Sequence, residues 1–194
     1  MVHPVNSDTI LRPGQTAPDF EQDTTNGSIR FHEWLKGSWC VLFSHSVEMD
    51  AETVRELGEA ARLRPEWSRR GVKVIGLSIG TSDAHARWER SLVESHGLVL
   101  NFPVIADADR SVSTLYNLGL ADTNFSSAMR HVCVIDPDKK LRLVQTYASA
   151  GGRDFNDVLR AVDDLQRSSA RKETTSVNGG WAGQDVQNTL ATQA

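Results

Sequence analysis

The chain has 194 residues, of which 39% are hydrophobic and 24% are charged, as expected for one globular domain with a short extension. Its formal net charge of -4 argues against a nucleic-acid surface, because no run of Lys and Arg supplies contacts to phosphates. No basic start is followed by an apolar run, and no apolar segment is long enough to cross a bilayer, so we expect a cytoplasmic protein without a membrane partner.

The first predicted elements are a hairpin, a helical turn and a buried strand. Two short strands flank Asn26-Gly27, a dipeptide that favours tight turns, and this pattern predicts a β-hairpin. Gly37 is expected to close one helical turn. Residues 38–45, with the sequence SWCVLFSH, are apolar on both sides, which is typical of a central strand.

Two helices and a further strand follow. Hydrophobic residues at helical spacing predict a helix over residues 51–70, with a kink at Pro65. Residues 71–80 form an apolar run that predicts a second buried strand. The next helix is expected to begin at a cap formed by Ser82 or Asp83.

The last part of the chain predicts a hairpin over residues 130–148 and an amphipathic helix over residues 153–168. Strands that alternate with helices, followed by this hairpin and helix, indicate an α/β fold with a mixed sheet, compatible with a thioredoxin-like topology. We therefore expect one domain over residues 1–168. A polar C-terminal arm, partly disordered, is expected over residues 169–194.

The two cysteines, Cys40 and Cys133, both lie in apolar, strand-like runs, where cysteine usually acts as a small core residue. Since side chains alternate along a strand, Cys40 is expected on the face opposite His45, and Cys133 opposite Arg130. The chain contains no CxxC motif, HExxH motif or glycine-rich phosphate loop, so we expect neither a metal nor another cofactor.

Six segments occur together, in order, in one known family. They are PGQTAPDF, TTNGSIRFHEWL, WCVLFSH, RELGEAARLRPEWSRRGVKVIGLS, NFPVIADADRSVSTLY and IDPDKKLRLVQTYASAGGRDFNDVLRAVDDLQ. With them the chain resembles the one-cysteine (1-Cys) peroxiredoxins of the AhpC/TSA family, from about residue 11 to about residue 166. The resemblance implies a thioredoxin-like fold of peroxiredoxin type, a homodimer, and a peroxide-reducing site on a loop of the pattern Pro-x-x-x-Thr-x-x-Cys.

The loop after FSH departs from this family pattern. Alignment without a gap places Ser46 at the family proline, Asp50 at the threonine and Thr53 at the peroxidatic cysteine. Peroxide reduction needs a thiolate that attacks the O–O bond and becomes a sulfenic acid, and a threonine hydroxyl does neither. The family mechanism is therefore expected to be absent.

Other site residues of the family are retained. The resemblance places the active-site arginine at Arg130, the histidine at His45, and a Gly-Arg pair at Gly152-Arg153. A helix start beside a guanidinium stabilises an anion or a developing oxyanion.

New acidic residues adjoin this pocket, and a carboxylate, an imidazole and a cation together support proton transfer. We therefore predict a non-redox enzyme that dehydrates, isomerises or cyclises a small organic substrate, in a biosynthetic pathway. The predicted catalytic residues are Arg130, His45, Asp50 and Thr53, and the predicted substrate-binding residues are Ser46, Glu48, Glu52 and Arg153.

Structural roles and other functions remain open for the same residues. Arg130 also suits a structural ion pair with Glu48, Asp50 or Glu52. His45 also suits a core position with a hydrogen bond to a backbone carbonyl, and Asp50 also suits the N-cap of the following helix. The chain is alternatively a non-catalytic peroxiredoxin homologue that binds a ligand or a partner. A residual thiol-dependent peroxidase, acting through Cys40 or Cys133, is the other alternative.

Overall fold

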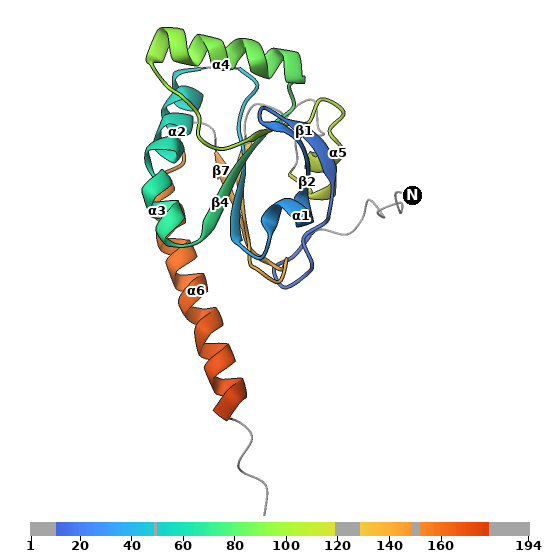
Figure 1. The fold of residues 1–194 in the computed structure, drawn as a ribbon, viewed down its shortest axis with the longest axis vertical. Helices are drawn as coiled ribbons and strands as arrows, with labels where there is room; N and C mark the ends of the chain where they lie inside the picture. Colours follow the sequence, from blue (N-terminus) through green and yellow to red (C-terminus); the bar gives the residue numbers. More distant parts are fainter. Residues whose placement is uncertain (1–10, 49, 119–128, 149–151, 179–194) are drawn as a thin grey trace, which may run out of the picture.

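A seven-stranded mixed sheet forms the centre of the protein (Figure 1). The computed structural model describes residues 11–48, 50–118, 129–148 and 152–178. The strands are β1 (Glu21–Thr24), β2 (Gly27–Arg30), β3 (Trp39–Ser44), β4 (Val72–Ser78), β5 (Val104–Ala106), β6 (Met129–Ile135) and β7 (Leu141–Ala148). Their order across the sheet is β2-β1-β5-β4-β3-β6-β7, and β3, β4 and β5 run parallel while the other pairs are antiparallel.

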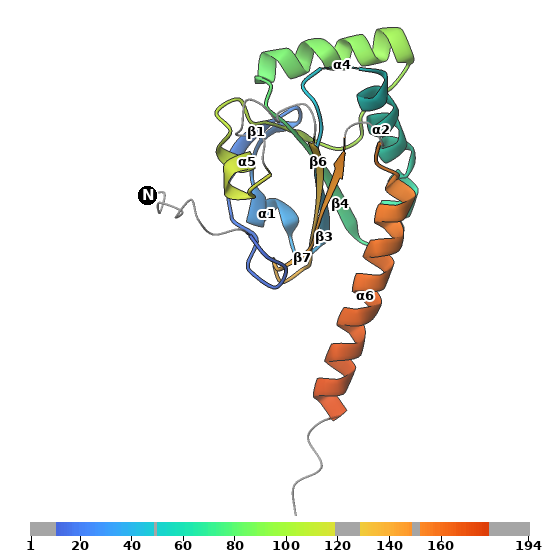
Figure 2. The ribbon, with the colours of Figure 1, turned by 180° about the vertical axis from the view of Figure 1, so that it is seen from behind.

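Helices cover both faces of the sheet, as Figures 1 and 2 show. They are α1 (Phe31–Leu35), α2 (Ala51–Arg62), α3 (Arg64–Arg69), α4 (Ser82–His96), α5 (Ser111–Leu115) and α6 (Phe155–Asn178). Residues of α2, α3, α4 and α6 pack in one hydrophobic cluster, and residues of α1 and α5 pack in the other. We call the two sides of the sheet the α2 face and the α1 face.

The strands assign their side chains to these faces by strict alternation. Val41, Phe43 and Val132 belong to the cluster on the α2 face, whereas Cys40 and Cys133 belong to the cluster on the α1 face. Every residue of β3 is buried, which confirms the central strand predicted from its apolar run. The prediction that both cysteines lie on the face of the sheet away from His45 and Arg130 is also confirmed.

Pro65 separates two helices instead of kinking one, so the prediction of a single helix was wrong. α2 ends at Arg62, and Pro65 lies in the first turn of α3. A proline has no N–H to donate, and the N–H groups of a first turn have no partner within the helix, so the proline is tolerated there.

The cap of α4 also differs from the prediction by one residue. The Thr81 hydroxyl accepts a hydrogen bond from the Ala84 N–H at 3.2 Å, and neither Ser82 nor Asp83 holds this position. Gly97 follows the helix in the left-handed conformation, with a φ of 60°.

The C-terminal helix is longer than its sequence pattern predicts. α6 runs from Phe155 to Asn178, past the expected end at residue 168, and its last turns extend beyond the rest of the molecule in both ribbon views (Figures 1 and 2). Residues 179–194 lie outside the described part of the chain, and the division at residue 168 stays a proposal. None of the described helices has the length and apolarity needed to cross a membrane.

Candidate functional site

A buried carboxylate shared by two arginines forms the centre of the candidate site. Glu56 of α2 accepts hydrogen bonds on the same Oε2 atom from Arg130 Nη1 at 2.6 Å and from Arg153 Nη2 at 2.7 Å. Its Oε1 atom accepts the backbone N–H of Arg153 at 2.7 Å. The side chains of Arg130, Glu56 and Arg153 are 4%, 0% and 0% exposed. Two buried guanidinium groups thus share one buried carboxylate.

Arg153 joins this cluster to the central strands of the sheet. Its Nη1 atom donates to the carbonyls of Ser44 and His131, each at 3.0 Å. These hydrogen bonds connect the start of α6 to β3 and β6. Its guanidinium lies 4.8 Å from the centre of the Phe43 ring and 5.0 Å from that of Phe155. Burial lowers the pKa of Arg153 to about 10, although Glu56 opposes the shift. The contacts of Arg153 position Glu56, and they leave its guanidinium fully buried.

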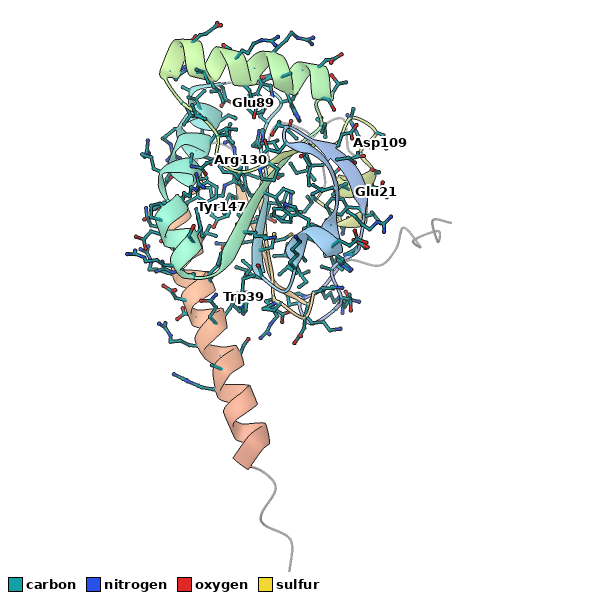
Figure 3. All side chains as sticks on the ribbon, viewed as in Figure 1. Glu21, Trp39, Glu89, Asp109, Arg130 and Tyr147 are labelled. Carbon is teal, nitrogen blue, oxygen red and sulfur yellow. The ribbon has the colours of Figure 1, made fainter. Side chains whose placement is uncertain are left out.

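Arg130 also faces the start of α2. Its Nη2 atom lies 3.8 Å from Asp50 Oδ1, and the same oxygen accepts the Thr53 N–H at 2.6 Å. Figure 3 shows Arg130 between α2 and the strands. Burial by itself raises the pKa of the Asp50 carboxyl, but hydrogen bonds from Thr53 and the charge of Arg130 lower it overall. Asp50 is therefore the predicted N-cap, and it also links the helix start to Arg130.

The main ion-pair partner of Arg130 is Glu56 and not one of the acids named from the sequence. Asp50 lies at the outer limit of salt-bridge distance, at 3.8 Å, while Glu56 lies at 2.6 Å. Glu48 is exposed, and Glu52 pairs with Arg55 through a contact of 2.6 Å.

Thr53 lies in the first turn of α2 and is fully buried. Its Oγ1 atom is near enough to the Asp50 carboxylate to help lower its pKa, but within the described residues it makes no hydrogen bond of normal geometry. Thr53 and Arg130 meet at Asp50 Oδ1. A buried hydroxyl and a buried guanidinium therefore lie close to the positive end of a helix.

His45 follows β3 and is 4% exposed. Its Nδ1 atom lies 2.8 Å from the Ser46 carbonyl, and its Nε2 atom has no hydrogen-bond partner among the described residues. Burial lowers the pKa of His45 to about 3, with smaller contributions from His85, Arg153 and Arg130. The ring is neutral near pH 7 and is a weak base, so it is unsuited to the proton transfer predicted for it.

The predicted substrate-binding residues do not form one surface. The Ser46 hydroxyl accepts the Glu48 N–H at 3.0 Å, which closes the loop locally. Glu52 points to Arg55, and Arg153 is enclosed beneath the site. In the part of the chain that the structure describes, no three His, Cys, Asp or Glu side chains are arranged to hold a metal ion.

Glu56 is the site residue that the sequence analysis missed. It follows Thr53 by three residues, and this spacing places both side chains on one face of α2. The available signal was indirect. A buried arginine requires a nearby carboxylate, and Glu56 lies next to Leu57, a residue of the hydrophobic stripe that the helix was expected to bury.

The cysteines lie away from these groups. Both are fully buried on the α1 face, while Arg130 and Glu56 join the α2 side of the molecule. Burial raises the pKa of the Cys40 thiol strongly and that of Cys133 to about 12. Neither thiol is set up to ionise near neutral pH.

Comparisons with known proteins agree on one family. Residues 13–144 match the model of the AhpC/TSA family. The chain is 41% identical to Peroxiredoxin-6 of Gallus gallus over 175 residues, which cover 85% of this chain and 77% of the relative. It is 39% identical to the mitochondrial Peroxiredoxin PRX1 of Saccharomyces cerevisiae, over 87% of this chain and 67% of that one.

A solved structure of the yeast mitochondrial 1-Cys peroxiredoxin superposes with a TM-score of 0.75 at 38% identity, covering 82% of this chain and 78% of that chain. The fold is therefore the peroxiredoxin type of thioredoxin-like fold, as the sequence predicted. The prediction of a non-redox acid/base enzyme was wrong, because these relatives are named peroxiredoxins and nothing links the fold to dehydration, isomerisation or cyclisation. The prediction rested on a carboxylate, an imidazole and a cation acting together, with Asp50 as the carboxylate, His45 as the imidazole and Arg130 as the cation.

Proposed function

Because the chain belongs to the AhpC/TSA family and has 1-Cys peroxiredoxins among its relatives, we propose that it is a peroxiredoxin homologue that binds a hydroperoxide, or an oxyanion of similar size, without reducing it. The observation that carries this proposal is the meeting of Arg130 and the Thr53 N–H at Asp50 Oδ1, where α2 begins; we call this proposed binding position the peroxide pocket. There the family's anion-stabilising groups surround a hydroxyl.

The pocket supports binding through its charge. Glu56 takes only Nη1 of Arg130, and the half-exposed Asp50 lies 3.8 Å from Nη2, so Nη2 keeps the capacity to donate to a negative or strongly polar oxygen. Arg130 presents several N–H donors, of which only Nη1 is committed to Glu56. The ligand would lie against these donors and the N-terminal turn of α2, with Asp50 limiting how much negative charge the pocket accepts.

The absence of turnover rests on the identity of residue 53. We place Thr53 at the position of the family's peroxidatic cysteine, on the gap-free match of the loop between His45 and Gly58. An alcohol with an ordinary, very high pKa gives no nucleophilic anion near pH 7, and its oxygen has no counterpart of sulfenic acid.

A residual thiol-dependent peroxidase is the second candidate, favoured by the peroxiredoxin names of the relatives. It requires Cys40 or Cys133 to reach peroxide. Both thiols are enclosed in the core with raised pKa values, so this route needs a local opening of the sheet.

The remaining proposals concern assembly and location. We propose a homodimer, as the family resemblance implies, and a cytoplasmic location. Light scattering coupled to size-exclusion chromatography tests the first, and microscopy of the tagged full chain tests the second.

The Thr53→Cys variant tests whether the pocket still recognises peroxide. Its thiolate would attack one peroxide oxygen, the O–O bond would break, and hydroxide would leave to be protonated while the sulfur becomes a sulfenic acid. Dithiothreitol would then reduce the sulfenic acid. We expect peroxide consumption at least about 100-fold above wild type, because a helix N-terminus and Arg130 both favour the thiolate.

Matched variants separate the two candidates. Arg130→Lys in the Thr53→Cys background retains a cation for Glu56 and is expected to lower the rate about tenfold or more, because lysine lacks the planar fork. A folded but inactive Thr53→Cys protein would refute peroxide recognition. Consumption by the wild type that disappears in Cys40→Ala or Cys133→Ala would instead establish the thiol-dependent candidate.

A further inference from the structure

A cavity separate from the peroxide pocket lies beside the C-terminal half of α4. It has a volume of about 360 Å³, within the usual range for small-molecule sites. It opens between α4, the segment that follows the helix, and the turn of the β1–β2 hairpin. Its lining, which defines what we call the α4 cavity, consists of Asn26, Glu89, Arg90, Leu92, Val93, Glu94, Leu98, Val99 and Leu100.

The walls of the α4 cavity are mainly apolar. Leu92 is buried and forms the base, while Leu98 and Leu100 are half-buried. Val93 and Val99 are 48% and 66% exposed, and they are two of the three large hydrophobic side chains exposed in the described ranges. An apolar cavity with an exposed apolar rim favours a ligand with a hydrophobic body.

One carboxylate lies inside this apolar setting. Glu89 is half-buried on α4, and Figure 3 places it on the side of the helix that faces the domain. Burial raises the pKa of Glu89, against a hydrogen bond from the Thr25 side chain. Among the described residues, no Lys or Arg side chain forms a salt bridge with Glu89 within 4.0 Å. A partly desolvated carboxylate without a cation is stabilised when a cationic ligand binds beside it.

The charged groups around the α4 cavity set the sign of the ligand. Glu89 and Glu94 contribute two carboxylates, and the exposed Arg90 contributes one guanidinium. This balance disfavours a carboxylate or phosphate ligand and favours an ammonium group. The cavity volume suits a molecule of roughly ten non-hydrogen atoms and is too small for a helix.

We propose that the α4 cavity binds a small organic amine, with the apolar body against Leu92, Leu98 and Leu100 and the ammonium group beside Glu89. The site shares no residue with the peroxide pocket. Its test is therefore independent of the proposed function.

Three probes of matched shape test the proposal on the full chain: 2-phenylethylamine, the neutral 2-phenylethanol and the anionic 3-phenylpropionate. Titrations followed by amide NMR should show the amine shifting resonances of residues 89–100, with a Kd on the order of 1 mM, as is typical of so small a ligand. The alcohol should bind about fivefold or more weakly at the same residues, and the anion should not bind there.

Variants then identify the group that selects the amine. Glu89→Gln keeps the shape of the side chain and should reduce amine affinity to that of the alcohol. Glu33→Gln, at an exposed position on α1, should change neither affinity. Equal binding of amine and alcohol by the wild type, an amine preference that survives Glu89→Gln, or shifts confined to other regions would each overturn the proposal. The wild-type comparison needs no variant to fold.

Discussion

The α2 face and the α1 face of the sheet are built from alternate residues of the same strands, yet they bury different chemistry. The α2 side joins apolar packing to His45 and the cluster of Glu56, Arg130 and Arg153. The α1 side buries Cys40, Cys133 and aliphatic or aromatic neighbours. The two cysteines thus lie where burial raises their pKa, and the Thr53 hydroxyl lies where the charged groups converge.

The two faces also differ in what holds them together, because only the α2 side contains a buried ion-pair cluster among the described residues. The ion-pair cluster fixes α2, β6 and the start of α6 against one another. We therefore expect the cluster to contribute to stability, whatever the site binds. The following predictions test the difference between the faces, from the largest expected effect to the smallest.

Removal of the shared carboxylate should have the largest effect. Glu56→Ala leaves Arg130 and Arg153 buried without their anion, and we expect a loss of about 3–5 kcal/mol in the free energy of unfolding. Urea unfolding followed by circular dichroism measures this change. The exposed Glu48→Ala variant is the control and should stay within about 0.5 kcal/mol of wild type. A loss below about 1 kcal/mol for Glu56→Ala would show that the cluster contributes little to stability.

Low pH should lower the free energy of unfolding through two histidines buried on the α2 side, His45 and His85. Burial lowers the pKa of His45 to about 3 and that of His85 to about 4, from an unfolded value of 6.5. Between the folded and unfolded pKa values, the unfolded chain binds more protons than the folded chain. The contribution of these histidines to the free energy of unfolding is therefore fully present above pH 6.5 and is lost as the pH falls. Each histidine should cost about 2 kcal/mol at pH 5 relative to pH 7.

Unfolding experiments at pH 7 and pH 5 isolate this contribution. His45→Gln should remove about half of the pH-dependent difference assigned to the pair, whereas the exposed His96→Gln should leave it unchanged. His85 is buried with its Nε2 atom 2.8 Å from Ser78 Oγ, so its own glutamine variant provides a second measurement. An unaltered pH dependence in both buried variants would mean that other groups control the acid response.

The smallest effect concerns the helix cap at the site. Asp50→Ala should lower stability by about 1 kcal/mol, because the Thr53 N–H loses its acceptor. Thr81→Ala removes the equivalent cap of α4, whose hydroxyl, within the described ranges, is paired with no arginine. We expect Asp50→Ala to exceed Thr81→Ala by a few tenths of a kcal/mol, the usual contribution of a partly exposed ion pair. A smaller loss of stability for Asp50→Ala than for Thr81→Ala would show that the contact between Arg130 and Asp50 does not stabilise the cap.

Much of this architecture follows from local patterns. The unbroken apolar run of β3 predicted a central strand, and the alternation along β3 and β6 placed Cys40 and Cys133 on the face away from the site. Asp50 was predicted as a cap because its short carboxylate reaches back to the helix N–H groups. These outcomes depend on neighbours within a few residues of one another.

The pairing inside the site depends on contacts far apart in the chain. Glu56 and Arg130 are 74 residues apart, and Glu56 and Arg153 are 97 residues apart. Of the acids near the loop, the sequence did not show which one turns inward, so Glu48 and Glu52 were grouped with Asp50 while Glu56 was overlooked. Burial decides the matter, because only an inward carboxylate can compensate the two enclosed guanidinium groups.

The sequence by itself determined the family, the order of the elements and the chemical limit at residue 53, since a side chain's reactivity is set by its own atoms. Only the tertiary structure decided which charges meet, how far burial shifts the pKa of His45, and that Glu89 lines a largely apolar cavity. Desolvation and long-range pairing arise from the folded surroundings of a group, and those surroundings come from segments that the local sequence does not contain.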